Sequence, residues 1–286
     1  MGRPMVARLA AAGFALQICD VRPEAAAALA AETGATVVPR TADLGPGLDA
    51  LILMLPDGAA VRQVLVADGV GARLAPGALV VDMGSCEPHG TAALGTELQA
   101  RGIDMVDAPV SGGVARAVNG TLTIMAGGST EAVERAQPLL RAMGNRIYAT
   151  GRLGSGQAMK SLNNFVSAAG LVATCEAVLI AQRFGLDPQV AAEVLDGSTG
   201  KNNTTEHKLR QHILSRTFGS GFSMDLMVKD LGIAASVARQ AGMPTVFVER
   251  CLEAWQAAQQ SLGHGRDHTE MARWIESVMA QPHTPS

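Results

Sequence analysis

The strongest constraint on the fold is a change in the hydrophobic pattern near residue 151. Before it, short apolar runs alternate with helical patterns; the apolar runs lie at 14–19, 50–55, 78–81 and 122–126. That alternation is typical of a parallel sheet with helices on both faces. After Gly151 the patterns are helical, beginning with 157–184 and ending with 268–280. The sequence therefore predicts an α/β fold, with a doubly wound domain over 1–151 and an all-α domain over 152–286.

Composition restricts the class of partner. The chain has 286 residues, 48% of them hydrophobic, and a net charge of −3, so it can bury a core and has no strongly basic character. Its four cysteines are widely spaced, which is typical of reduced thiols in the cytoplasm. Neither a run of 18 apolar residues nor a signal-peptide pattern is present. We expect a cytoplasmic protein that binds neither nucleic acid nor membranes.

The first twenty residues carry part of a dinucleotide-binding pattern. Gly2 opens a helical pattern, and Asp20 closes the apolar run "FALQICD". In a Rossmann-type unit, a carboxylate about 20 residues after the glycine loop accepts hydrogen bonds from the ribose. Gly2 fits the third glycine of G-x-G-x-x-G, which predicts a first strand and two glycines upstream of Met1. The alternative is that Gly2 only starts a helix and that Asp20 is an ordinary turn residue.

Six motifs follow one another along almost the whole chain: "MGRPMVARLAAAGF…D", "LILMLPD", "VVDMGSCEP", "DAPVSGG", "GSGQAMKSLNN" and "GFSMDLMVKDL". Together they resemble the β-hydroxyacid dehydrogenase family, which includes 3-hydroxyisobutyrate dehydrogenases and tartronate semialdehyde (2-hydroxy-3-oxopropionate) reductases. Family members usually open with a strand and a G-x-G-x-M-G loop, whereas this sequence starts at M-G. We expect an upstream start, because a chain without that strand would lose the middle of its sheet.

The resemblance implies that NAD is the cofactor. Asp20 favours NAD because a carboxylate repels the 2′-phosphate of NADP, whereas Arg22 could bind that phosphate and leaves NADP as the alternative. Ser85 keeps a hydroxyl where the family usually has D-M-S-T, although Gly84-Ser85 replaces Ser-Thr here. The full set of predicted cofactor-binding residues is Gly2, Asp20, Arg22, Leu55, Pro56, Ser85 and Lys229.

Lys160 is the predicted catalytic residue. It lies among apolar residues near the start of a helical pattern, where desolvation and the helix N-terminus both disfavour a charged ammonium. A lone helical lysine is more often a solvated charge, but the resemblance implies that Lys160 is the general acid/base. It also implies that Asn164, on the same helix face, orients the substrate or the lysine, and that Asp230 lies close to that lysine. Ser111, Gly112 and Gly113 are implied to bind the substrate's carboxylate, and Phe222 to cover the substrate or nicotinamide.

The predicted reaction interconverts a short β-hydroxy acid and its semialdehyde with NAD(P), with the substrate between the two domains. One alternative is a dehydrogenase of phosphorylated sugar acids of the 6-phosphogluconate type. Another, if the start is genuine, is a non-catalytic NAD-binding assembly protein. No metal site is expected, and His264 and His268 are predicted to be surface residues. The helical stretch 157–184 is the predicted interface of a homodimer or homotetramer.

Overall fold

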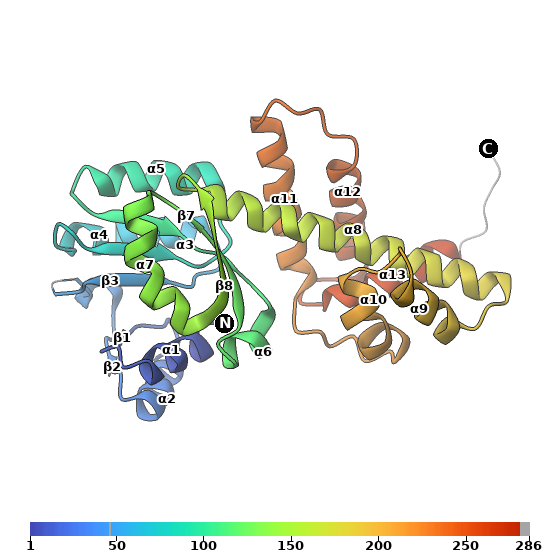
Figure 1. Cartoon of the computed structure of the whole chain (residues 1–286), viewed down its shortest axis with the longest axis horizontal. Helices are drawn as coiled ribbons and strands as arrows, with labels where there is room; N and C mark the ends of the chain where they lie inside the picture. Colours follow the sequence, from blue (N-terminus) through green and yellow to red (C-terminus); the bar gives the residue numbers. More distant parts are fainter. Residues whose placement is uncertain (46, 281–286) are drawn as a thin grey trace. The chain divides into compact units, whose positions relative to one another are not determined.

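The computed structural model describes residues 1–45 and 47–280 (Figure 1). Its contacts divide the chain into two compact units, Met1–Lys160 and Ser161–Ser286. The division falls later than the predicted boundary at 151, because the first turn of a long helix is hydrogen-bonded to the sheet of the first unit. The first unit holds the strands, and the second is helical.

The main sheet of the first unit has the order β3-β4-β5-β7-β6, with β8 paired to β7. Strands β3, β4 and β5 are parallel, but β7 is antiparallel to β5 and to β6. The prediction of a parallel sheet is therefore correct for β3 to β5 and wrong for the direction of β7, whereas β8, which is parallel to β7, was not predicted. The chain after β5 turns back through a short strand and a short helix, which suffices for antiparallel pairing. The bounds are β3 Ala50–Leu53, β4 Leu79–Asp82, β5 Asp104–Asp107, β6 Val110–Ser111, β7 Leu122–Gly127 and β8 Gly144–Gly151.

Two further strands, β1 (Gln17–Ile18) and β2 (Thr36–Val37), form a separate two-stranded parallel sheet. Helix α2 (Pro23–Thr33) connects them, as the sequence pattern at 23–33 predicts. Pro23 fits its first position because the missing N–H would have no helical partner there. Gly34 ends the helix at φ 73°, a left-handed conformation that glycine adopts easily.

Helices cover both faces of the main sheet (Figure 1). Along β4, Leu79 and Val81 belong to one apolar core, which includes residues of α1 and α7, whereas Val80 belongs to a second core on the opposite face. Burial on both faces explains why β4 reads as a continuous apolar run. The flanking helices are α1 Gly2–Ala11 and α7 Thr130–Met143 in the first core, and α3 Gly58–Arg62, α4 Val70–Arg73 and α5 Pro88–Gln99 in the second.

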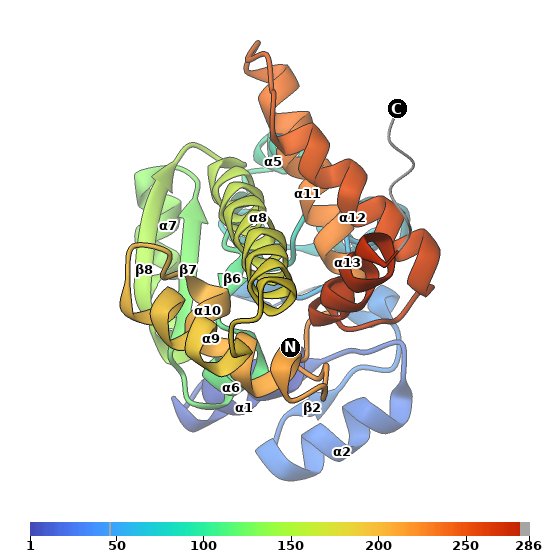
Figure 2. The same cartoon turned by 90° about the vertical axis from the view of Figure 1, so that its right-hand side faces the viewer.

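The second unit is built around the long helix α8 (Ser155–Phe184), which starts in the first unit. Its buried residues share one core with Leu231, Trp255 and Met271. Figure 2 looks nearly along α8 and shows α9 and α10 on one side of it, with α11 and α12 on the other. The prediction of an all-α second half is confirmed. The other helices are α9 Pro188–Gly197, α10 Asn203–His207, α11 Met224–Gln240, α12 Val248–Leu262 and α13 Met271–Met279.

Helix α8 is long and apolar enough to cross a membrane, judged by length and composition alone. Core helices of water-soluble proteins meet the same criteria, and one such helix is weak evidence for a membrane span. In the second unit, its residues Ala168, Leu171 and Cys175 are buried in the protein core.

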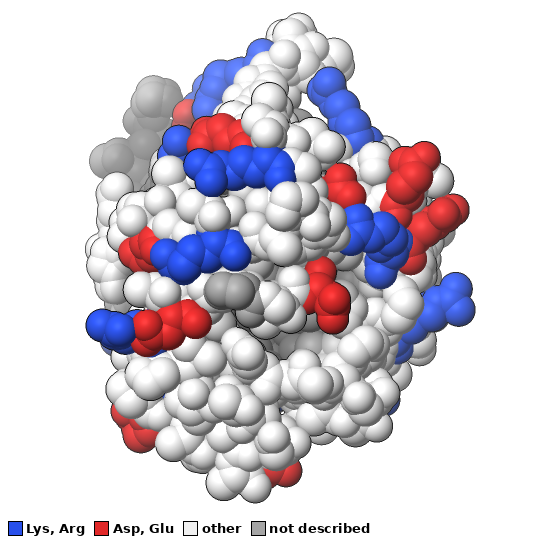
Figure 3. Space-filling model, turned by 90° about the vertical axis from the view of Figure 1, so that its left-hand side faces the viewer, with Lys and Arg blue, Asp and Glu red and all other residues white. Residues whose placement is uncertain are grey.

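Charged side chains of both signs are mixed on the surface. Within the first unit, Arg62 pairs with Glu97 at 2.8 Å, and Arg135 pairs with Asp104 at 2.5 Å. On the face drawn in Figure 3, Lys and Arg lie among Asp and Glu and do not gather into one patch.

Candidate active site

Two buried carboxylates at the ends of β4 and β5 hold the first turn of α8. The carboxylate of Asp107 accepts the backbone N–H of Gly154 at Oδ1 and that of Gln157 at Oδ2, both at 2.7 Å. The Gln157 side chain accepts the N–H of Cys86 at 2.9 Å and donates to Asp82 Oδ2 at 3.4 Å. Ligands bind at the carboxyl ends of the strands in open α/β sheets, so α8 begins where a ligand site is expected.

This close packing requires glycine at two positions. A Cβ on Gly156 would lie 2.2 Å from the carbonyl oxygen of Met125, and a Cβ on Gly84 would lie 2.7 Å from that of Leu55. Neither distance leaves room for a methyl group. The glycines in "VVDMGSCEP" and "GSGQAMKSLNN" therefore let the loop after β4 and the start of α8 approach the sheet.

Asp107 is a buried carboxyl with opposing influences on its charge. Burial raises the pKa of Asp107 to about 7, the N–H groups of Gly154 and Gln157 act in the opposite direction, and nearby Asp82 raises it further. Asp107 opens the sequence motif "DAPVSGG" but is not among the predicted site residues. An acidic residue that ends an apolar strand was the available signal.

Lys160 lies one turn after Gln157 and is only 9% exposed. Since Asp107 and Asp82 fix the first turn of α8, they also fix the direction in which Lys160 leaves the helix.

Asn164 lies one turn after Lys160, on the same face of α8. Its Nδ2 donates to Asp230 Oδ2 at 2.5 Å, and Asp230 is 2% exposed. Two of the three predicted catalytic residues, Asn164 and Asp230, are therefore in direct contact in the second unit.

Lys229 also lies against Asp230, with 3.8 Å between Nζ and Oδ1. Lys229 is also one of the predicted cofactor-binding residues. Neighbouring residues do leave a helix in different directions, but the four-carbon lysine side chain is long enough to reach back.

The predicted carboxylate-binding residues form the turn between β6 and a short helix, α6 (Gly113–Val118). Ser111 ends β6, and Gly112 and Gly113 follow at φ 128° and 69°. Both angles favour glycine. At Gly112 a Cβ would also lie 2.4 Å from Cδ of Arg116.

The predicted cofactor residues of the first unit follow strand ends or start a helix. Asp20 comes after β1, Leu55 and Pro56 after β3, and Ser85 after β4.

Asp20 is exposed. Its Oδ1 accepts the N–H of Arg22 at 2.9 Å and lies 3.6 Å from Arg22 Nε. At Gly2, in the first turn of α1, a Cβ would lie 3.9 Å from Met54 Cγ. The exposed carboxylate of Asp20 and the half-buried hydroxyl of Ser85 each follow a parallel strand, and dinucleotides bind at the carboxyl ends of such strands.

His268 is buried, so its predicted position at the surface is wrong. It is 2% exposed, and its ring packs edge-on against Phe222, with 5.4 Å between ring centroids, and stacks on Trp255. Its Nδ1 lies 2.9 Å from the Phe222 carbonyl oxygen, which makes Nδ1 the donor. His264 is exposed, and its Nδ1 lies 2.8 Å from Asp225 Oδ1. In the described ranges, no group of three or more His, Cys, Asp or Glu side chains could hold a metal ion.

Lys208 is a partly buried amine that is not among the predicted site residues. It follows α10, and its Nζ lies 3.4 Å from Ser167 Oγ on α8. Burial lowers the pKa of Lys208 to about 8. The local sequence gives no signal for this residue, because its partner Ser167 lies 41 residues earlier in the chain.

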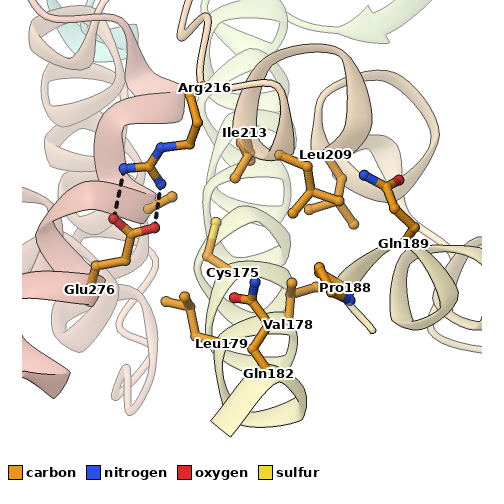
Figure 4. A pocket seen from close by; sticks show the side chains of 12 residues that line it. Cys175, Val178, Leu179, Gln182, Pro188, Gln189, Leu209, Ile213, Arg216 and Glu276 are labelled. Carbon is orange, nitrogen blue, oxygen red and sulfur yellow. Dashed lines mark hydrogen bonds and ion pairs between the residues drawn. The ribbon is translucent and has the colours of Figure 1, made fainter. Parts of the chain in front are cut away.

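A cavity of about 140 Å³ in the second unit is separate from the predicted site residues, none of which lines it (Figure 4). Arg216 and Glu276 form an ion pair on one side, with 2.9 Å between Nη2 and Oε2. Cys175 lines the cavity, and burial raises its pKa to about 12, so this residue stays a thiol. The other lining residues include Val178, Leu179, Leu209 and Ile213.

Comparison with known proteins identifies the family. A family model described as the NAD-binding domain of 6-phosphogluconate dehydrogenase matches residues 1–151. A second, described as NAD-binding of NADP-dependent 3-hydroxyisobutyrate dehydrogenase, matches residues 154–275.

Individual relatives agree with these matches. The chain is 37% identical to an NAD-dependent L-serine dehydrogenase of Pseudomonas aeruginosa, over 98% of this chain and 96% of the relative. It is 34% identical to the 3-hydroxyisobutyrate dehydrogenase of the same organism, over 96% and 94%. A solved structure of Mycobacterium tuberculosis 3-hydroxyisobutyrate dehydrogenase with L-serine has a TM-score of 0.87 and 31% identity, and the match covers 96% of this chain and 95% of that one. The chain belongs to the β-hydroxyacid dehydrogenase family and is an NAD(P)-dependent hydroxyacid oxidoreductase.

Proposed function

We propose that the protein interconverts a short β-hydroxy acid, of the 3-hydroxyisobutyrate or 2-hydroxy-3-oxopropionate type, and its semialdehyde, with Lys160 as general acid/base. The relatives named for L-serine and 3-hydroxyisobutyrate support this substrate class, because both names describe a carboxylate with a hydroxyl on the β-carbon. The single observation that carries the role of Lys160 is its burial one turn after Gln157, which the carboxylates of β4 and β5 hold in place.

Each predicted site residue has a proposed part in this reaction. Ser111, Gly112 and Gly113 bind the substrate's carboxylate with the hydroxyl and the backbone N–H groups before α6. Lys160 accepts the hydroxyl proton during oxidation and returns it during reduction. Asn164, which is fixed by its hydrogen bond to Asp230, orients the substrate or Lys160. Phe222 covers the substrate. The bound nicotinamide supplies hydride transfer.

For the cofactor, we propose NAD in preference to NADP. The support is the exposed carboxylate of Asp20 after β1, which suits two ribose hydroxyls and repels a 2′-phosphate. Arg22 reduces this preference, because its side chain lies near the same carboxylate. Leu55, Pro56 and Ser85 are proposed to line the cofactor, with Gly2 at the helix start and Lys229 in the second unit.

We further propose a homodimer or homotetramer in the cytoplasm, with α8 at the subunit interface. The support for the interface is a line of exposed apolar side chains along α8: Met159, Leu162, Val166, Ile180 and Phe184. The support for the compartment is that all four cysteines are free thiols and three of them are buried.

Lys160→Met tests the catalytic role. We expect turnover of 3-hydroxyisobutyrate or L-serine with NAD⁺ to fall by at least about a hundredfold, because general acid–base catalysis contributes roughly 10²–10⁴-fold. NADH affinity, measured by fluorescence titration, should stay within about threefold of wild type, since Lys160 is proposed to act on the substrate. Lys201→Met, at an exposed lysine, is the matched control. A Lys160→Met enzyme with wild-type turnover would refute the assignment.

A further inference from the structure

The ammonium of Lys208 is partly buried, and it makes a single weak contact with the described residues. Within residues 1–45 and 47–280, its Nζ makes one hydrogen bond, which is to Ser167 Oγ at 3.4 Å. Within the same ranges it forms no ion pair with a carboxylate. Taking a cation out of water is costly unless an anion or several acceptors compensate for the lost hydration. This position therefore favours an incoming anion.

The carboxylate that attracts Lys208 electrostatically is already bound to other donors. Asp267 attracts Lys208 electrostatically, but its carboxylate accepts hydrogen bonds from Ser220 Oγ and the N–H of Gly221. It also accepts the N–H and the hydroxyl of Thr269. The charge of Lys208 is thus not required to satisfy Asp267. His268 is neutral near pH 7, because burial and the charge of Lys208 lower its pKa to about 4.

Lys208 lies over the α8 face that carries the proposed catalytic residues. Lys160, Asn164 and Ser167 are at positions i, i+4 and i+7 of one helix, which places their side chains in a row. The helix rises about 10 Å between the first and the last of them. The ammonium of Lys208 therefore lies beside the last residue of this row, Ser167.

We propose that Lys208 and Ser167 form a subsite for a second carboxylate on the substrate, so that the preferred substrate is a β-hydroxy acid with a further acidic group a few carbons away from the hydroxyl. This inference rests on the proposed function, since Lys160 defines the reacting end. One ammonium and one hydroxyl match the two oxygens of a carboxylate. A phosphate dianion, with three oxygens, would require more donors.

Matched kinetics with Lys208→Met are the main test. The substrates are 2-(hydroxymethyl)succinate, which has the second carboxylate, and its near-isostere 2-(hydroxymethyl)butanoate, which lacks it. We expect wild type to prefer the diacid in kcat/KM, and Lys208→Met to reduce that preference by about 10- to 100-fold, as for one charge-assisted hydrogen bond. Lys208→Arg should retain the preference, and Lys201→Met should match wild type. Equal losses on both substrates, or a wild-type preference for the monoacid, would overturn the subsite.

A binding measurement separates failure of the subsite from failure of the proposed function. Calorimetry with glutarate and with pentanoate, in the presence of NAD⁺, requires no turnover. Glutarate should bind wild type about 10-fold more tightly than pentanoate, and Lys208→Met should abolish the difference. If neither hydroxy acid is oxidised, the proposed function fails, and the binding difference between glutarate and pentanoate alone decides the subsite. A difference that depends on Lys208 supports the subsite. No such difference rejects the subsite. If Lys208→Met does not fold, Ser167→Ala is measured instead and should weaken glutarate binding selectively.

Discussion

His268 and Asp107 are buried residues whose pKa shifts make stability depend on pH in opposite directions. Burial lowers the pKa of His268 to about 4, so between pH 4 and its ordinary value near 6.5 only the unfolded chain is protonated there. The free energy of unfolding therefore falls as the pH drops through that window. Burial raises the pKa of Asp107 to about 7, so the folded chain holds the extra proton between pH 3.8 and 7. Its contribution is present at low pH and is lost as the pH rises through 7.

We expect His268→Asn to remove the acid sensitivity that His268 adds. The asparagine Nδ2 can replace Nδ1 as donor to the Phe222 carbonyl, but it does not titrate. Wild type should lose roughly 3 kcal/mol of unfolding free energy relative to the variant between pH 6.5 and 4. Urea unfolding at several pH values measures this difference, and the shared effect of Asp107 cancels. His89→Asn, at an exposed histidine, should run parallel to wild type. A His268→Asn curve parallel to wild type would contradict the argument.

Single residues differ in how far sequence reveals their role. For Lys160, the apolar neighbours in its helical pattern predict a desolvated amine, and its burial is confirmed, whereas its catalytic role was predicted from the family resemblance. The environments of Lys208 and His268 come from segments some 40 or more residues away in sequence, such as Ser167 on α8 and the Phe222 carbonyl. The hydrophobic pattern of the sequence around Lys208 and His268 does not indicate those contacts. The catalytic and binding roles themselves stay predictions until the variants are measured.

At the scale of elements, long and strongly patterned segments were predictable, and short or exposed ones were not. The helical patterns at 23–33, 88–101, 131–143 and 157–184 match α2, α5, α7 and α8 closely. The strands β2 and β6 have two residues each, which is too short for a periodicity, and β8 is mostly exposed. The sequence pattern over 204–215 predicts one helix, but the structure interrupts it at Lys208, whose φ and ψ of −128° and −36° leave the helical region. Strand direction depends on distant pairing, so the antiparallel β7 had no local signal.

Gly156→Ala tests whether the start of α8 must pack tightly on the sheet. The added methyl would lie 2.2 Å from the Met125 carbonyl oxygen, so we expect a loss of about 2 kcal/mol from overpacking. Because Lys160 is one turn away, kcat should fall as well. Gly232→Ala in α11 is the matched control: its methyl meets no atom within 4 Å, and it should gain about 0.5–1 kcal/mol. Urea unfolding and steady-state kinetics measure both. Equal stability of the two variants would show that α8 shifts to accommodate the methyl.

At the scale of the whole molecule, a line of apolar side chains on α8 lacks an explanation within the described part of the chain. Val166 is 68% exposed and Phe184 is 83% exposed, and they belong to an apolar line along the 30-residue helix α8. Exposed apolar residues are ordinary when scattered, but a line along one helix is typical of an interface. The core residues of α8 point the other way, into the second unit. A second copy of the chain is the occupant that we propose, since most oligomers pair identical surfaces across a twofold axis.

Val166→Glu should therefore produce a monomer. A twofold axis through α8 would bring two introduced carboxylates into one apolar interface, where an unpaired buried charge costs several kcal/mol. The measurement is molar mass by light scattering during size-exclusion chromatography, over a range of protein concentrations. Val246→Glu makes the same chemical change at an 87% exposed valine outside α8, and it should leave the mass at the wild-type value. A wild-type protein that is monomeric at all concentrations, or a Val166→Glu variant that keeps the oligomeric mass, would place the interface elsewhere or remove it.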